Sequence, residues 1–208
     1  TPLTELAYPS IRGMMKVSEG NTFTTQDRFY GIIPQFVEPD DPTYSRAQLI
    51  SYLDQLDADT AGNLMSEDPY WQGKKLHPLA LGVLISDQIG DTERRDHYLS
   101  LLRNILTDWY TYSPDEPLHS YYFYYSDEWG TIFPYGSGFG VNTGLTDHHF
   151  TYGYYVFASA VLATYDQTFL QDYGDMVELL IRDYANPSRT DEQFPRLRNF
   201  DAYAGHSW

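Results

Sequence analysis

The chain has 208 residues, of which 42% are hydrophobic and 20% charged, so its composition is that of one globular domain and not of a disordered or fibrous protein. It carries 13 Lys and Arg against 29 Asp and Glu, a formal net charge of −16 that repels nucleic-acid phosphates and anionic membranes. The absence of cysteine excludes disulfides, a thiol nucleophile and a thiolate zinc site. We therefore expect neither nucleic acid nor membrane as a partner.

Glycine and proline interrupt the first 42 residues, where segments 22–25 and 29–33 are typical of short strands or extended loops. The N-terminal residues Thr1–Glu5 show no basic segment followed by an apolar one, so we expect no signal peptide within this chain.

Three helices are predicted next. The first begins at Ser45, where Ser45 and Gln48 form a capping-box pattern. The second covers residues 70–89, and Pro78 inside it predicts a kink or a split. The third follows Asp91 as its N-cap and carries an unbroken apolar stripe at helical spacing: Tyr98, Leu101, Leu102, Ile105, Leu106 and Trp109.

Residues 113–146 lose the helical period. Segments 121–125 and 131–133 predict a short β-hairpin, and a glycine-rich loop follows over 136–144. A fourth helix is predicted to begin near Asp147 and a fifth to cover residues 167–184.

The short joints between these helices predict antiparallel pairs, the second helix with the third and the fourth with the fifth. The fold class is therefore mainly α with a short β-hairpin insertion, and paired helices of this kind are typical of a helical toroid. Two such pairs cannot close a ring, so we interpret residues 1–208 as a sector of a larger helical barrel.

Aromatic residues make up 17% of the chain and include 20 Tyr. A buried Tyr needs a partner for its hydroxyl, so this number predicts either an unusually polar core or a long aromatic groove. A groove of this kind suits a flat ligand rich in hydroxyl groups, and carbohydrate fits that description best.

The densest cluster of functional side chains is Asp147-His148-His149 with the aromatic residues after it. An Asp at a helix start is typical of an N-cap, and by residue type alone capping is the simpler interpretation. Adjacent histidines point to different parts of a helix surface, and the i, i+4 spacing of a zinc motif is absent. We therefore expect neither a metal nor any other cofactor.

The segment DHHFTYGY at 147–154 closely resembles a motif of glycoside hydrolase family 81, the endo-β-1,3-glucanases. The resemblance extends to MKV at 15–17, to YWQGK at 70–74, to the hairpin and to RNFD with GHSW at the C-terminus, in the order that the family has them. One departure is Thr151, where the family usually has His, which removes a potential donor to sugar.

The resemblance implies an (α/α)₆ barrel preceded by a β-sandwich, inverting hydrolysis of β-1,3-glucan such as laminarin, and Asp147 as the general acid. Inversion needs a protonated carboxyl and a carboxylate base about 6.5–9.5 Å apart. Burial against Tyr152 or Tyr154 would keep the acid protonated.

The base in the family is a Glu beyond the GHSW segment, and no Glu of this chain occupies the matching position. We therefore expect a fragment of the catalytic barrel, inactive alone, that needs the remaining helices to complete the site and that also lacks the sandwich domain. Glucan as the substrate implies a secreted protein, extracellular or associated with the cell wall.

The candidate substrate-binding residues are aromatic platforms, which pack on the C–H face of a sugar ring, and polar side chains in reach of hydroxyl groups. They are Tyr125, Trp129, Tyr152, Tyr154, Trp208, Lys74, His149, Asp201 and His206. Two alternatives stay open: a glucan-binding module without catalysis, and a metal-dependent phosphoesterase of the DHH type, which Asp147-His148-His149 matches as a triplet.

Overall fold

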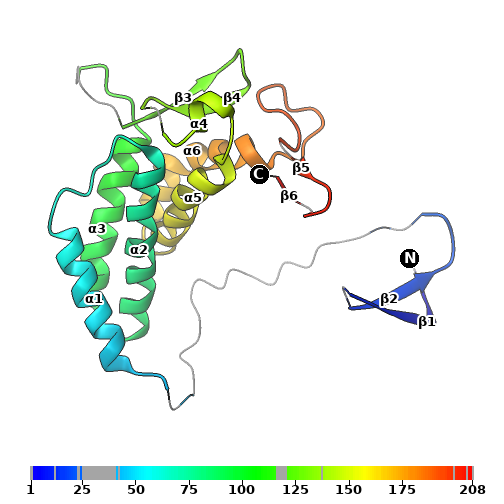
Figure 1. The fold of residues 1–208 in the computed structure, drawn as a ribbon, viewed down its shortest axis with the longest axis horizontal. Coiled ribbons are helices and arrows are strands. Elements are labelled where there is room, and N and C mark those ends of the chain that lie inside the picture. Colours follow the sequence, from blue (N-terminus) through cyan, green and yellow to red (C-terminus); the bar gives the residue numbers. More distant parts are fainter. Residues whose placement is uncertain are drawn as a thin grey trace. The chain divides into compact units, whose positions relative to one another are not determined.

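The computed structural model describes residues 2–11, 13–22, 24, 41, 43–115, 121–136, 138–198, 200–204 and 206–207. The chain divides into two compact units, Thr1–Ile33 and Pro34–Trp208, which are described separately (Figure 1). Apart from Thr22 and Thr24, the strands or loops predicted at 22–25 and 29–33 lie outside the described residues.

The first unit contains an antiparallel hairpin of β1 (Leu3–Ser10) and β2 (Gly13–Ser18). Its register pairs Ala7 with Lys16 and Tyr8 with Met15. Gly13 supplies a φ of +105° next to the turn, which only glycine adopts easily. The sequence did not predict this hairpin, because neither strand alternates strictly between apolar and polar residues.

The second unit is built on five long helices: α1 (Arg46–Thr60), α2 (Pro69–Gln88), α3 (Thr92–Trp109), α5 (His148–Tyr165) and α6 (Gln167–Ala185). These bounds confirm the predicted helices to within a few residues. Ser45 accepts a hydrogen bond from the Gln48 amide at 3.3 Å, as predicted for a cap. The Gln48 side chain contacts the Tyr52 hydroxyl instead of reaching back, so only half of the capping box forms.

Helix α2 runs without a break through Pro78, so the predicted split is wrong. Its start is well defined: Pro69 stands in the first turn and the Asp68 carboxylate accepts from the Tyr70 amide at 2.8 Å. Proline inside a helix removes one backbone hydrogen bond. Leu76 and Leu79, fully buried on either side of Pro78, offset that loss by packing in the core.

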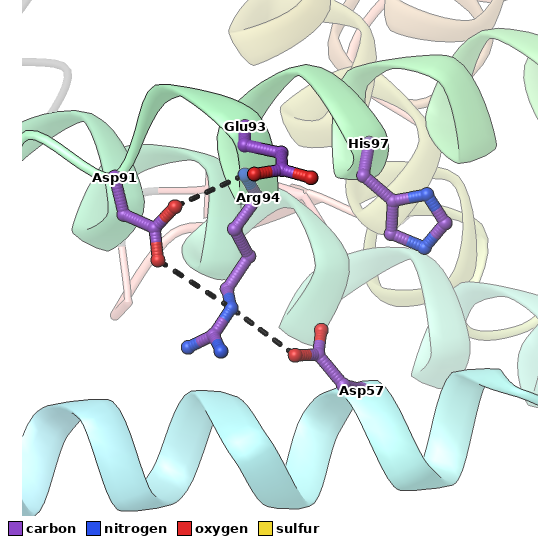
Figure 2. A pocket seen from close by; sticks show the side chains of 5 residues that line it. All are labelled: Asp57, Asp91, Glu93, Arg94 and His97. Atoms are coloured by element: carbon purple, nitrogen blue, oxygen red, sulfur yellow. Dashed lines mark hydrogen bonds and ion pairs between the residues drawn. The ribbon is translucent and has the colours of Figure 1, made fainter.

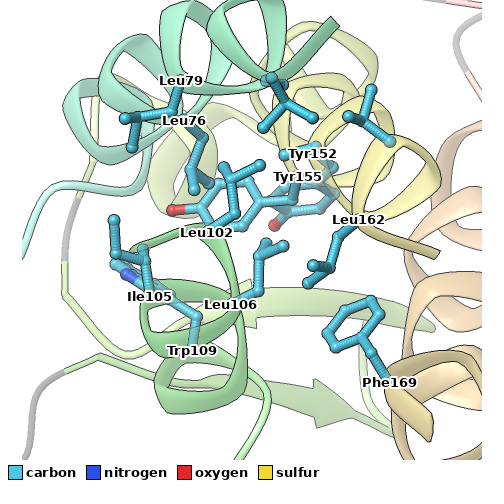
Figure 3. Packing of buried hydrophobic residues seen from close by; sticks show 14 of the residues in the cluster. Leu76, Leu79, Leu102, Ile105, Leu106, Trp109, Tyr152, Tyr155, Leu162 and Phe169 are labelled. Atoms are coloured by element: carbon cyan, nitrogen blue, oxygen red, sulfur yellow. The ribbon is translucent and has the colours of Figure 1, made fainter. Parts of the chain in front are cut away.

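The core lies where α2 contacts α3 and α5, and α5 in turn contacts α6. Figure 3 shows leucines from α2 and α3 meeting Tyr152 and Tyr155 of α5, with Trp109 at the end of α3. The predicted pairing of the second helix with the third, and of the fourth with the fifth, is thus confirmed. The unit is mainly α, as predicted.

Tyrosines enter this core because each hydroxyl finds a partner. Tyr152 donates to the carbonyl of Ile132 at 2.6 Å, and Tyr155 donates to the carbonyl of Pro69 at 3.0 Å. Burial raises the pKa of both phenols well above the ordinary value, so both stay protonated donors. Other tyrosines, such as Tyr112 and Tyr135, stay more than half exposed, so the polar core and the aromatic surface both occur.

The predicted hairpin is present as β3 (Phe123–Ser126) and β4 (Thr131–Pro134), and every residue of β4 is buried. The glycine-rich loop after it contains one short helix, α4 (Val141–Gly144). Two-residue strands β5 (Phe200–Asp201) and β6 (His206–Ser207) pair near the C-terminus. In Figure 1 the hairpin and α4 lie together at one end of the long helices, next to the start of α5.

Helices α2 and α5 approach closely at Gly73. A Cβ added there would lie 2.5 Å from Cδ2 of Tyr154, whereas a Cβ at Gly153 on α5 would meet nothing within 4 Å. Gly73→Ala should therefore destabilise the protein by about 1–3 kcal/mol despite the better helix propensity of Ala. Gly153→Ala, the matched control, should stabilise it by about 0.5–1 kcal/mol. Denaturant unfolding measures both; equal effects would contradict the close approach.

Candidate active site

Asp147 is the N-cap residue of α5, yet its side chain makes no capping hydrogen bond. Its backbone is left-handed, with φ 58° and ψ 20°, and its side chain is exposed. An N-cap that serves its helix normally has extended dihedrals and bonds the amides of the first turn. The capping interpretation therefore does not describe this carboxyl. The left-handed conformation costs an ordinary residue about 1–2 kcal/mol, although Asp tolerates it better than most.

His148, the next residue, points the other way and is fully buried. Its Nδ1 atom is hydrogen-bonded to Oδ2 of Asp183, near the end of α6. Its Nε2 atom lies 3.2 Å from the carbonyl oxygen of Val141, the first residue of α4. One side chain thus joins three helices directly behind Asp147.

Asp183 is also fully buried, and its other oxygen is bound as well. Oδ1 accepts hydrogen bonds from the Thr131 hydroxyl at 2.7 Å and from the Ile132 amide at 2.9 Å, both on β4. The Arg198 guanidinium lies 3.6 Å from the same oxygen and donates to the Asp183 carbonyl at 3.0 Å. These contacts attach the hairpin and the C-terminal segment to α5 and α6.

Neither Asp183 nor Arg198 was predicted from the sequence to have a role in the site. A signal was present, because Phe169, Met176, Leu180 and Asp183 share one face of a helix at spacings of seven, four and three residues. A carboxylate on an apolar face needs a partner in the core. The sequence does not say which partner, since His148 lies 35 residues earlier.

Aromatic rings gather beside the start of α5. Phe150, one turn after Asp147, packs against Tyr154 and Tyr70, with ring centroids 5.5 Å and 6.1 Å apart. Tyr70 stacks on Phe139 at 4.7 Å and meets Trp71 edge-on at 5.2 Å. Phe139, Phe150 and Trp71 are each about half or more exposed, so part of each ring is open to a ligand. We call these six residues, Tyr70, Trp71, Phe139, Phe150, Tyr154 and His149, the aromatic cluster.

The structure places several of the predicted residues in or near this cluster. Tyr154 belongs to it, and half-buried His149 packs against Phe150 at 6.2 Å. Lys74 is exposed on α2, one turn after Tyr70. Tyr70 and Phe150 lie in the motifs singled out above but were not predicted to bind sugar, and Phe139 was not predicted to have a role, because the sequence does not say which aromatic rings come together at the surface.

Other predicted residues lie elsewhere. Tyr152 is in the core with its hydroxyl bound, so its assignment as a sugar platform is wrong, and it cannot shield the exposed Asp147 as expected. Thr151 is fully buried too, so the exchange of His for Thr removes no sugar contact. Tyr125 is half-buried on β3, and its hydroxyl donates to the Gln193 carbonyl. Trp129 is 57% exposed in the hairpin turn.

Asp201 is half-buried and accepts hydrogen bonds from the amides of Tyr203 and Ala204, which shapes the turn after β5. His206 belongs to β6, opposite Asp201, and its side chain is outside the described residues, as is Trp208. A role in binding sugar stays a prediction for these three residues.

A separate pocket of about 340 Å³ lies between α1 and α3 (Figure 2). Its lining is polar, with four charged residues, Asp57, Asp91, Glu93 and Arg94, and His97 beside them. Arg94 reaches Asp57 at 3.1 Å, Asp91 at 3.6 Å and Asp54 at 2.7 Å, so its charge is shared among three carboxylates. The ion pairs of Arg94 with Asp54 and Asp57 connect α3 to α1. The lining of this pocket includes none of the aromatic rings that a sugar would pack against.

Within the part of the chain that the structure describes, no three His, Asp or Glu side chains come together in a way that could hold a metal ion. Over the same residues, no helix combines the length and the apolar character needed to cross a membrane.

Comparison with known proteins identifies the family. The profile of the glycosyl hydrolase family 81 C-terminal domain matches residues 45–208, most of the chain. This chain belongs to glycoside hydrolase family 81.

Relatives and a solved structure agree with this assignment. A glucan endo-1,3-beta-D-glucosidase of Thermobifida fusca is 42% identical over the whole chain, and one of Acetivibrio thermocellus is 41% identical over 97% of it. A glutamate-to-alanine mutant of the glycoside hydrolase family 81 protein from Clostridium thermocellum aligns over the whole chain with a TM-score of 0.74 and 40% identity. The chain spans about a quarter of each of these proteins: 27%, 26% and 28%.

Membership of glycoside hydrolase family 81 removes the phosphoesterase alternative, and the geometry gives the reason. A histidine binds a metal ion through a ring nitrogen that is not already bound to another group. Both ring nitrogens of His148 instead contact protein oxygens in the core, away from the exposed Asp147.

Lys74 has a neighbour that reports on its charge. The pKa of His77, one turn further along α2, is lowered by burial and then by the Lys74 charge. Lys74→Met should raise the pKa of His77, as NMR titration of the ring would measure. Lys75→Met is the matched control, because Lys75 reaches the carbonyl of Met65 at 3.2 Å instead.

The lowered pKa of His77 also makes the stability of the fold depend on pH. A His whose pKa is lowered by folding supports the fold above its unfolded pKa, and this support is lost as pH falls through the folded value. Lys74→Met should reduce the loss of stability on acidification between these two pKa values. An unchanged His77 titration would contradict the proximity of Lys74.

Proposed function

We propose that the complete protein containing this chain is an endo-β-1,3-glucanase that hydrolyses β-1,3-glucan such as laminarin with inversion, and that Asp147 is its general acid. Two relatives at 41–42% identity bear the name glucan endo-1,3-beta-D-glucosidase, which supports the reaction class. The observation that carries the assignment of the acid is the exposed carboxyl of Asp147, which makes no capping bond.

A general acid must reach the oxygen that leaves the sugar, so it has to lie at a surface that the substrate can touch. Asp147 meets this requirement, and the aromatic cluster begins one helical turn away at Phe150. Exposed ring faces suit the C–H faces of glucose units, while Lys74 and His149 can bond their hydroxyl groups. The cluster is therefore the proposed surface along which the glucan chain lies.

The helix pairs of this chain form, in our proposal, a sector of an (α/α)₆ catalytic barrel. The paired packing of α2 with α3 and of α5 with α6 supports it, as does the alignment with a family 81 structure. Inversion needs a second carboxylate about 6.5–9.5 Å from the acid. We assign this base to the remaining part of the barrel. We further propose that a β-sandwich domain precedes the barrel.

Polymeric glucan is too large to enter a cell, so the proposed substrate implies action outside the cell or at the cell wall. A relative in Schizosaccharomyces pombe, 30% identical over the chain, is named primary septum glucan endo-1,3-beta-D-glucosidase, which supports this location.

Asp147→Asn in the complete protein should lower the release of reducing sugar from laminarin by about 10²–10⁴-fold, because the leaving oxygen then departs unprotonated. The control is Asp175→Asn, an exposed carboxyl on α6, which should leave the rate unchanged. Normal turnover by Asp147→Asn would remove the assignment. Glucan binding by the wild-type protein without any release of sugar would instead favour a non-catalytic binding module.

A further inference from the structure

We propose that the buried pair His148–Asp183 is a positioning device for the general acid. This inference rests on the function proposed above. The pair holds the connection between α4 and α5 in place, so that Asp147 cannot turn back and cap its own helix. Neither residue is expected to touch the substrate, because both side chains are fully buried.

The connection that the pair holds is strained at two places. Leu145 has φ 49° and Asp147 has φ 58°, so two non-glycine residues within three positions are left-handed. Left-handed residues persist only where the surrounding structure fixes them. Here the bond from His148 to Val141 closes the connection on itself, and Asn142 attaches α4 to β4 by donating to the Pro134 carbonyl at 2.9 Å.

Released from these bonds, the connection has a lower-energy alternative. With extended dihedrals, Asp147 would become an ordinary N-cap and its carboxylate would accept bonds from the first amides of α5. Hydrogen bonds from backbone N–H groups stabilise the ionised form of a carboxyl group, so it gives up its proton more readily. A carboxyl group turned toward the helix also no longer faces the substrate. The free Asp147 carboxyl therefore depends on the anchoring of its neighbour.

The hydrogen-bond partners also indicate where the protons of the pair lie. The Val141 carbonyl can only accept, so Nε2 of His148 carries a proton. Nδ1 and Oδ2 of Asp183 share a further proton, whichever of the two atoms holds it. Arg198 lies close to Oδ1, and the rings of Tyr152 and Phe133 lie 4.8 Å and 6.4 Å from that of His148. Every polar atom of the pair is thus bound, which is what a rigid anchor requires.

The test uses three variants of the complete protein. Asp183→Leu keeps the branched shape of the side chain, with a larger volume, and removes its hydrogen bonds. His148→Asn keeps a donor near Nδ1 and loses the bond to Val141. Asp183→Asn can accept from Thr131 and Ile132 and donate to Nδ1 of a neutral His148, so it should restore the anchor. Leu102→Ala, in the core on α3, is the control for lost stability alone.

We expect Asp183→Leu and His148→Asn to lower kcat by about 10²-fold with KM within about threefold, since misplacing a catalytic group by about 1 Å costs that much. The alkaline limb of their pH–rate profile should move to lower pH. Asp183→Asn should keep at least about ten times the kcat of Asp183→Leu, and Leu102→Ala should lower Tm without moving the limb.

Two results would overturn the proposal. If Asp183→Leu and His148→Asn behave like Leu102→Ala, with a lower Tm but an unchanged kcat and pH limb, the pair is merely structural. If Asp183→Leu does not fold, His148→Asn alone decides between these outcomes. Asp147→Asn, measured in parallel, separates the two proposals: its loss of activity keeps Asp147 as the acid even where the positioning role fails.

Discussion

A hydrogen bond between two fully buried side chains, His148 and Asp183, is the constraint on which the rest of the helical unit depends. It joins the first residue of α5 to the end of α6, and the remaining atoms of the pair bind α4 and β4. Removing one partner of such a pair costs about 3–5 kcal/mol, because it leaves the other buried and unpaired. The hairpin, the glycine-rich loop and Asp147 take their positions from this one point.

Tyrosine supplies both the core and the surface around that point. In the core, the hydroxyls of Tyr152 and Tyr155 donate hydrogen bonds to backbone carbonyls of β4 and α2. Both rings therefore fill the core without leaving a polar group unsatisfied. Outside, Tyr70 stacks with Phe139 beside α5. The same residue type thus builds the scaffold and the proposed glucan surface, and only its partners tell the two uses apart.

Much of the helical unit could be predicted because its signals are local. The Asp91 cap and the apolar stripe of α3 determine a helix from a few neighbouring residues. The site was only half predictable. Asp147 stands out in the sequence, but its left-handed backbone and the bond between His148 and Asp183 arise from residues far apart in the chain. Tyr152 was misassigned for the same reason: helical spacing does not say which aromatic ring faces the core.

The central claim is that Asp147 protonates the leaving oxygen, and leaving-group dependence tests it most directly. In an aryl glycoside of a β-1,3-glucan oligosaccharide, 2,4-dinitrophenolate leaves without being protonated. The sugar oxygen that leaves in laminarin hydrolysis needs a proton from the general acid. Asp147→Asn in the complete protein should therefore hydrolyse the aryl substrate at a rate close to that of the wild type while losing laminarin hydrolysis. An equal loss on both substrates would contradict the claim.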